Sequence, residues 1–138
     1  MKETNIKEIR KHILLSSPIE QVWKAVSTSD GLASWWMENT LDKSAGENFL
    51  LHTGHFGDSP CRVTEWVPNE LFAFDWGKDW HLRFELKELS PAQTELIVIH
   101  SGWDPEKTTE FGQPHPVVYS IMDEGWEALI HQKLPSVL

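Results

Sequence analysis

Tryptophan is the residue type that most distinguishes this sequence as a candidate for ligand chemistry. The chain has eight tryptophans and a single tyrosine among its 138 residues. A tryptophan side chain is large and amphipathic, so it either fills a core or lines a binding surface. Because eight are more than a chain of this length needs to fill its core, we expect several of them to border a site for a small molecule.

Glu65 is the candidate polar group of such a site. It shares strand parity with Val63 and Val67, so its carboxylate points inward if these valines do. An inward carboxylate must be paired or neutral. It then anchors a ligand or forms an acid/base pair with His52 or His100, or else it makes a structural ion pair or hydrogen bond within the sheet. A bulge in the strand would turn Glu65 to solvent.

The histidines and the cysteine do not form a metal-site pattern. His52-x-x-His55 with Cys61 provides three candidate ligands, whereas structural zinc requires four at defined spacing. We therefore expect no metal. His100 and His131 stand alone in the sequence, and we expect them to be hydrogen-bonded structural histidines.

We also expect no cofactor. The eight glycines form neither of the common nucleotide-binding fingerprints, and the residues around Cys61 do not match a nucleophile motif. The sequence thus favours a binding protein over an enzyme.

Composition and charge indicate which classes of binding partner and which cellular compartment to expect. A formal net charge of −9 disfavours nucleic acid and anionic membranes, because both are bound by clustered Lys and Arg. No apolar run reaches the roughly 20 residues of a membrane-spanning helix. The N-terminus has no hydrophobic signal region, and one cysteine suits a reducing compartment. We expect a cytoplasmic protein.

Hydrophobic periodicity predicts the elements that position these residues. The clearest strand is 80–89, in which Trp80, Leu82, Phe84 and Leu86 alternate with polar residues, as in an antiparallel sheet with one wet face. A short helix follows Pro18, and a second covers 32–37. The other predicted strands are 6–15, 49–52, 62–67, 71–76 and 94–101.

A long amphipathic helix is predicted over 117–134. Met122, Gly125, Trp126 and Leu129 lie on its apolar face. Because glycine within a helix is unfavourable, we expect Gly125 to allow a close approach to a neighbour. A curved antiparallel sheet of about six strands can wrap this helix and leave a cavity between them. The sequence therefore predicts one α+β domain over residues 1–138.

In this order, the motifs resemble those of the START-like (helix-grip, SRPBCC) proteins of the Bet v 1-like superfamily, in the branch related to activators of the heat-shock-protein-90 ATPase. The resemblance covers about residues 9–134 and implies the helix-grip fold. The superfamily includes lipid carriers, hormone receptors, cyclases and co-chaperones, so the shared fold does not define one activity. The matching motifs are Ser17-Pro18-x-Glu20-x-Val22-Trp23-x-Ala25, Trp35-Trp36, Val63-x-Glu65-x-x-Pro68-x-x-Leu71, Thr94-x-Leu96, His100-Ser101-Gly102 and Gly125-Trp126.

The function expected from residues and resemblance together is the binding of a small, mostly apolar molecule, aromatic, polyketide-like or lipid-like, in an internal cavity. Two alternatives remain open: a cofactor-free cyclase, dehydratase or hydrolase that uses the same cavity, and a protein-interaction module with a chaperone partner. The expected ligand-binding residues are Trp36, His52, Glu65, Phe74, Trp76, Trp80, Phe84, Trp103, Met122 and Trp126.

Overall fold

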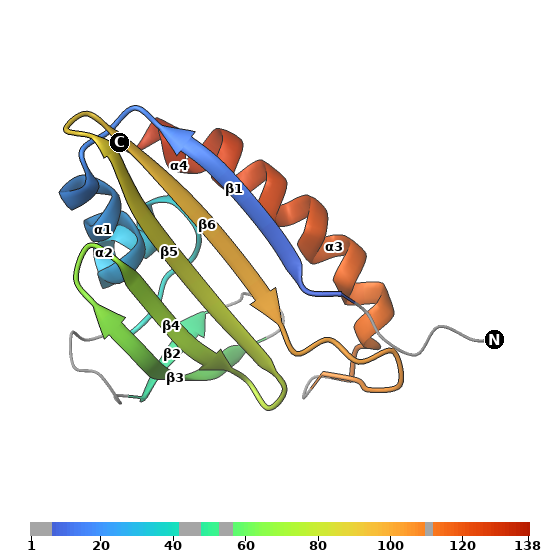
Figure 1. The fold of residues 1–138 in the computed structure, drawn as a ribbon. Helices are drawn as coiled ribbons and strands as arrows, with labels where there is room; N and C mark the ends of the chain where they lie inside the picture. The colour runs from blue at the N-terminus through green and yellow to red at the C-terminus, as the bar shows by residue number, and fades with distance from the viewer. Residues whose placement is uncertain (1–6, 42–47, 53–56, 110–111) are drawn as a thin grey trace.

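The computed structural model describes residues 7–41, 48–52, 57–109 and 112–138. Its centre is one curved sheet of six strands in the order β1-β6-β5-β4-β3-β2 (Figure 1). All neighbouring strands are antiparallel. The predicted α+β helix-grip fold is therefore confirmed. The strands are β1 (Ile9–Leu15), β2 (Asn48–His52), β3 (Asp58–Val67), β4 (Leu71–Trp76), β5 (Trp80–Ser90) and β6 (Gln93–Ser101).

The strands alternate between a buried and a more exposed face. In β5, Leu82, Phe84 and Leu86 are buried, while Arg83 and Glu85 between them are partly exposed. This alternation follows from the two-residue repeat of a strand, which turns successive side chains to opposite faces. The buried face of the sheet carries the hydrophobic core, as the sequence pattern predicts.

Two short helices cover one end of the sheet (Figure 1). α1 (Ile19–Ser27) follows β1, and α2 (Ser29–Trp35) follows after one residue, Thr28. The Thr28 hydroxyl accepts a hydrogen bond from the Gly31 backbone N–H at 3.0 Å, which caps the first turn of α2. α2 thus begins three residues before the predicted start and delivers Trp35 and Trp36 to the core.

The C-terminal helix runs along the sheet beside β1 (Figure 1). Its backbone is helical throughout, as α3 (His115–Ala128), a π-helical turn η2 (Leu129–Lys133) and α4 (Leu134–Ser136). The continuous helix predicted over 117–134 is confirmed; the π turn is an addition. Within the described ranges, no helix is long and apolar enough to cross a membrane.

Lys11 of β1 attaches this helix to the edge of the sheet. Its ammonium group lies 2.9 Å from Asp123 and 3.0 Å from Glu127 of α3. Burial disfavours the charged form, but hydrogen bonds to the two carboxylates outweigh this and raise the pKa of Lys11. Lys11 therefore remains charged and holds the helix against the edge strand.

Gly125 does not have the predicted role. Apart from its own helical turn, a Cβ atom built on it would meet no atom of the described residues within 4 Å, so none of these residues approaches the helix closely there. The prediction was wrong because a glycine on an apolar helix face also fits beside open space.

Candidate functional site

Four tryptophans contact the His100 ring on the buried side of the sheet, and a fifth packs against two of them. We call this group the tryptophan cluster: Trp36, Trp76, Trp80, Trp103 and Trp126 with His100. The His100 ring stacks on Trp76 with centroids 5.0 Å apart. It also lies 4.9 Å from Trp80 and 4.7 Å from Trp103. Trp36 closes the group, 5.4 Å from Trp76 and 5.1 Å from Trp126.

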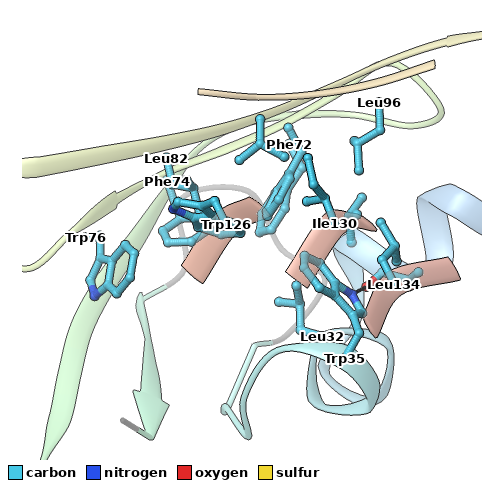
Figure 2. Close-up of a cluster of buried hydrophobic side chains, with 14 of the residues drawn as sticks. Leu32, Trp35, Phe72, Phe74, Trp76, Leu82, Leu96, Trp126, Ile130 and Leu134 are labelled. Carbon is cyan, nitrogen blue, oxygen red and sulfur yellow. Dashed lines mark hydrogen bonds between the residues drawn. The ribbon is translucent and has the colours of Figure 1, made fainter. Parts of the chain in front are cut away.

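Five different parts of the chain deliver these tryptophan rings. Trp36 follows α2, Trp76 ends β4, Trp80 begins β5, Trp103 follows β6, and Trp126 projects from α3. Figure 2 shows Phe72, Phe74 and Trp76 of β4 on the side of the sheet where Trp126 lies. His100 reaches the cluster because it continues the inward parity of Leu96 and Val98 in β6.

His100 has a defined tautomer. The Trp126 indole N–H donates a hydrogen bond to His100 Nδ1 at 3.1 Å. Because an indole nitrogen is a donor only, Nδ1 is the acceptor and the ring proton sits on Nε2. The residue is fully buried, and burial, with a smaller contribution from His115, lowers the pKa of His100 to about 3. The histidine is therefore neutral at physiological pH.

Two N–H donors in the cluster have no hydrogen-bond partner among the described residues. They are His100 Nε2 and Trp80 Nε1, and both atoms are buried. Two other indole N–H groups of the cluster do have partners. Trp103 Nε1 donates to the His100 carbonyl at 3.0 Å, and Trp126 Nε1 donates to His100 Nδ1. Buried polar groups in proteins nearly always have partners, so this pair of donors requires an explanation.

Gly102 fixes the geometry at one edge of the cluster. Its φ of +94° lies in the left-handed region, and a Cβ atom would stand 2.1 Å from the Asp79 carbonyl oxygen. Only glycine allows the end of β6 to approach the β4–β5 turn so closely. This approach places Trp103 beside Trp80, with ring centroids 4.8 Å apart.

A further polar group next to the cluster was missed by the sequence reasoning. Asp79 Oδ1 accepts a hydrogen bond from Lys107 Nζ at 3.1 Å, while Asp79 Oδ2 is buried without a hydrogen-bond partner and lies 3.8 Å from His115 Nε2. His115 Nδ1 accepts from the Asp104 backbone N–H. Burial lowers the pKa of His115, although the nearby Asp79 carboxylate opposes this shift. No local sequence pattern connects residues 79 and 115.

The remaining apolar candidates lie around the cluster. The Phe74 ring is 6.5 Å from Trp36, and the Phe84 ring is 6.2 Å from Trp126. Met122 is partly buried against the same core. The structure thus brings together the aromatic residues named from the sequence; their role in binding a ligand stays a prediction.

The inward orientation of Glu65 is corrected by the structure. The pairing of β3 with β4 shifts register between Val63 and Glu65, so a bulge turns Glu65 to the outer face opposite Ala73. There its carboxylate accepts a hydrogen bond from Arg83 at 2.7 Å, and 44% of its side chain is exposed. Glu65 forms an ion pair on the outer face and lies away from the tryptophan cluster.

His52 also lies outside the cluster. It is exposed at the end of β2, and its Nδ1 lies 2.8 Å from Asp58 Oδ1. His55 is outside the described residues. In the part of the chain that the structure describes, no three histidine, cysteine or acidic side chains gather as a metal site would require. The acid/base pairs named from the sequence, Glu65 with His52 or His100, are not assembled.

A hollow of about 330 Å³ lies elsewhere on the molecule, between α1, α2 and the C-terminal residues. Gln21, Lys24, Asp30 and Leu138 are among the residues that line it. No buried unpartnered polar atom of the described chain belongs to its lining. The tryptophan cluster is therefore the stronger candidate site.

Solved structures with the same fold cover nearly the whole chain. A Bacillus halodurans protein, BH1534, is 38% identical over 98% of this chain and 99% of its own, with a TM-score of 0.85. DynU16, a protein of the dynemicin biosynthetic locus, has 18% identity over 96% of this chain and 47% of its own, with a TM-score of 0.76. PFC0360w from Plasmodium falciparum, described as an HSP90 activator, has 16% identity over 91% of this chain and 92% of its own, with a TM-score of 0.74. The last two likenesses show the fold alone.

A search of curated proteins finds no match. The family model "Activator of Hsp90 ATPase homolog 1-like protein" matches residues 16–138. This range includes β2 to β6 and all residues of the tryptophan cluster, and it begins directly after β1. This match, together with the 38% identity to the Bacillus halodurans protein, determines the family of the chain. The chain belongs to the activator of Hsp90 ATPase homolog 1-like family.

Proposed function

We propose that this protein binds a small, mostly apolar molecule at the tryptophan cluster, between the sheet and α3. The observation that carries the proposal is the partial exposure of Trp36 and Trp80. Both rings contact fully buried members of the cluster, Trp36 against Trp126 and Trp80 against His100. The cluster therefore extends from the core to the surface, so a ligand can reach aromatic side chains without unfolding the sheet.

The composition of the cluster supports this function. Small-molecule sites are mostly apolar and contain a few polar groups that orient the ligand. Here indole rings supply the apolar surface, and the buried N–H groups of His100 and Trp80 are the polar groups. Gly125, the neighbour of Trp126 in α3, faces open space, which leaves room beside the helix.

Binding without turnover agrees better with the site than catalysis does. General acid/base catalysis requires a titratable group within hydrogen-bond reach of the reacting atoms. The lowered pKa of His100, about 3, makes it a poor base, and Glu65 and His52 lie outside the cluster. The family resemblance supports the same conclusion, because many helix-grip proteins hold apolar ligands.

A ligand screen with two matched variants tests the proposal. Compounds from fatty acids to flat polycyclic aromatics are titrated while tryptophan emission and melting temperature are recorded. A ligand at 100 times its dissociation constant should raise the unfolding free energy by about 2.7 kcal/mol, and hence the melting temperature by roughly 5–10 °C. Trp36→Phe should weaken binding about three- to tenfold, because a ring contact in the cluster is reduced.

Trp23→Phe is the control. Trp23 is also a partly exposed tryptophan, but it packs edge-on against Trp66 at 5.5 Å, outside the cluster. Its replacement should leave the affinity unchanged. Equal losses in both variants, or no saturable ligand at all, would contradict the proposed site. Binding to a chaperone of the Hsp90 type, which the family name suggests, would then be the function to test next.

A further inference from the structure

The two unpartnered donors of the tryptophan cluster define the chemistry of the ligand more closely than its apolar walls do. His100 Nε2 and Trp80 Nε1 are both buried and lack hydrogen-bond partners among the described residues. Their rings are neighbours, with centroids 4.9 Å apart. An unpaired buried N–H costs free energy comparable to a lost hydrogen bond, so both groups gain if a ligand supplies an acceptor.

The character of His100 as a donor is fixed by its surroundings. Trp126 donates to Nδ1 at 3.1 Å, so the imidazole proton must stay on Nε2. A neutral histidine could otherwise exchange its two tautomers and present an acceptor. While Trp126 holds Nδ1, the free nitrogens of His100 and Trp80 are both N–H donors, and neither can accept a hydrogen bond. A ligand hydroxyl or amine can therefore interact with them only through its own lone pairs.

The charges near the cluster favour a neutral ligand. Asp79 Oδ2 is buried without a hydrogen-bond partner and belongs to the residue that precedes Trp80. Its carboxylate disfavours an anion beside Trp80, and the negative faces of the indole rings act in the same sense. The two N–H donors, in turn, require a ligand atom with a free lone pair, which an ammonium group does not have.

We infer that the ligand bound at the tryptophan cluster carries a neutral oxygen acceptor, such as a carbonyl oxygen, which receives hydrogen bonds from His100 Nε2–H and Trp80 Nε1–H. This inference rests on the proposed function and adds a selectivity to it. The aromatic walls provide affinity for any flat apolar molecule, whereas the two donors select molecules with an oxygen at one edge. A site with unpaired donors rejects an analogue that lacks the acceptor.

Two pairs of compounds with nearly equal shape test this selectivity. 1-Indanone is compared with indane, and 9-fluorenone with fluorene, so that in each pair a carbonyl replaces a methylene. The ketone should bind about tenfold more tightly than its hydrocarbon, about threefold for each of the two hydrogen bonds. In spectra of the ¹⁵N-labelled protein, the Trp80 indole N–H signal should move downfield with the ketone and not with the hydrocarbon.

Trp80→Phe separates the hydrogen bond from packing. The variant keeps an aromatic ring but has no indole N–H. Any loss of packing weakens the ketone and the hydrocarbon equally, so it does not change the ratio of their affinities. This ratio should fall from about ten to about three or less, since one donor is removed. Trp23→Phe, which removes an indole outside the cluster, should keep the full ratio.

The outcomes distinguish this inference from the proposed function. If ketones and hydrocarbons bind equally well, the donors are directed at aromatic faces; the inference is then wrong while the proposed function stands. A ketone preference that survives in Trp80→Phe, without a shift of the Trp80 N–H signal in the unmutated protein, also overturns the inference. If neither member of either pair binds, the inference fails, and the proposed function fails as well if the wider screen finds no saturable ligand.

Discussion

A histidine that is buried among tryptophans must remain neutral, because a charged imidazolium would lose its hydration without gaining an acceptor. His100 meets this condition: its Nδ1 accepts from Trp126, and burial lowers its pKa to about 3. In the unfolded chain the same side chain has an ordinary pKa near 6.5. Below pH 6.5, His100 is protonated in the unfolded chain but stays neutral in the folded chain until the pH approaches 3.

This difference predicts a loss of stability in acid. His100 stabilises the fold fully above pH 6.5, and its contribution is lost as the pH falls from 6.5 towards 3. When the pH falls from 7 to 5, protonation of this one histidine in the unfolded chain lowers the unfolding free energy by about 2 kcal/mol. Urea unfolding at several pH values measures it. His115, whose pKa is also lowered, adds to the effect in the same direction.

His100→Gln is the variant that isolates this contribution. The glutamine amide can accept a hydrogen bond from Trp126 and donate one, but it does not titrate. Between pH 7 and pH 5, the unfolding free energy of the variant should fall by about 2 kcal/mol less than that of the unmutated protein, whatever the variant's stability at neutral pH. His12→Gln removes an exposed histidine and serves as the control. Parallel pH profiles for the protein and His100→Gln would show that His100 is not held neutral.

At the scale of the elements, two glycines have opposite requirements. Gly102 needs its left-handed backbone and its missing Cβ, because the Asp79 carbonyl occupies the adjacent space. Gly125 lies in the middle of α3, and among the described residues outside its own helical turn no atom lies within 4 Å of its Cβ position. A helix interior disfavours glycine, so Gly125 costs stability and provides only open space.

Gly125→Ala should therefore raise the unfolding free energy by about 0.5–1 kcal/mol, the difference between the two residues in a helix interior. Gly102→Ala is the matched contrast and should destabilise the fold by at least 1–3 kcal/mol, because strain at a positive φ adds to a backbone clash. Urea unfolding measures both. A destabilised Gly125→Ala variant would mean that a neighbour needs the space beside the helix.

The strands were predictable where burial alternates locally, and β3 shows the limit of that reasoning. The predicted and observed ranges of β4 agree, and those of β5 differ by one residue. Aromatic residues at every second position mark β4, and alternating apolar and polar residues mark β5. In β3 the parity changes at a bulge between Val63 and Glu65. The bulge arises from the pairing with β4, which no local pattern in the sequence contains. For this reason the strand pattern gave an inward Glu65 only on the condition that no bulge intervened, and the structure shows the bulge and the structural ion pair instead.

On the scale of the whole molecule, the tryptophan cluster joins segments that are far apart in the sequence. Trp36, Trp76 and Trp126 come from the end of α2, from β4 and from α3, and their rings touch one another or the His100 ring of β6. The aromatic residues could be named from composition and parity. The hydrogen bond between Trp126 and His100 could not, because the two side chains meet only when α3 packs across the sheet.

This connectivity predicts that the cluster and the sheet unfold together. His100 cannot separate from Trp126 unless α3 leaves the sheet, and it cannot separate from Trp76 unless the strands β4, β5 and β6 come apart. Either event exposes much of the core. Urea transitions followed by tryptophan emission and by far-ultraviolet circular dichroism should then have the same midpoint, as expected for a two-state domain. Trp23→Phe removes an indole outside the cluster, so the emission of this variant reports the cluster more directly. An emission change at lower urea than the loss of circular dichroism would contradict this prediction, because it would show that the cluster opens while the sheet persists.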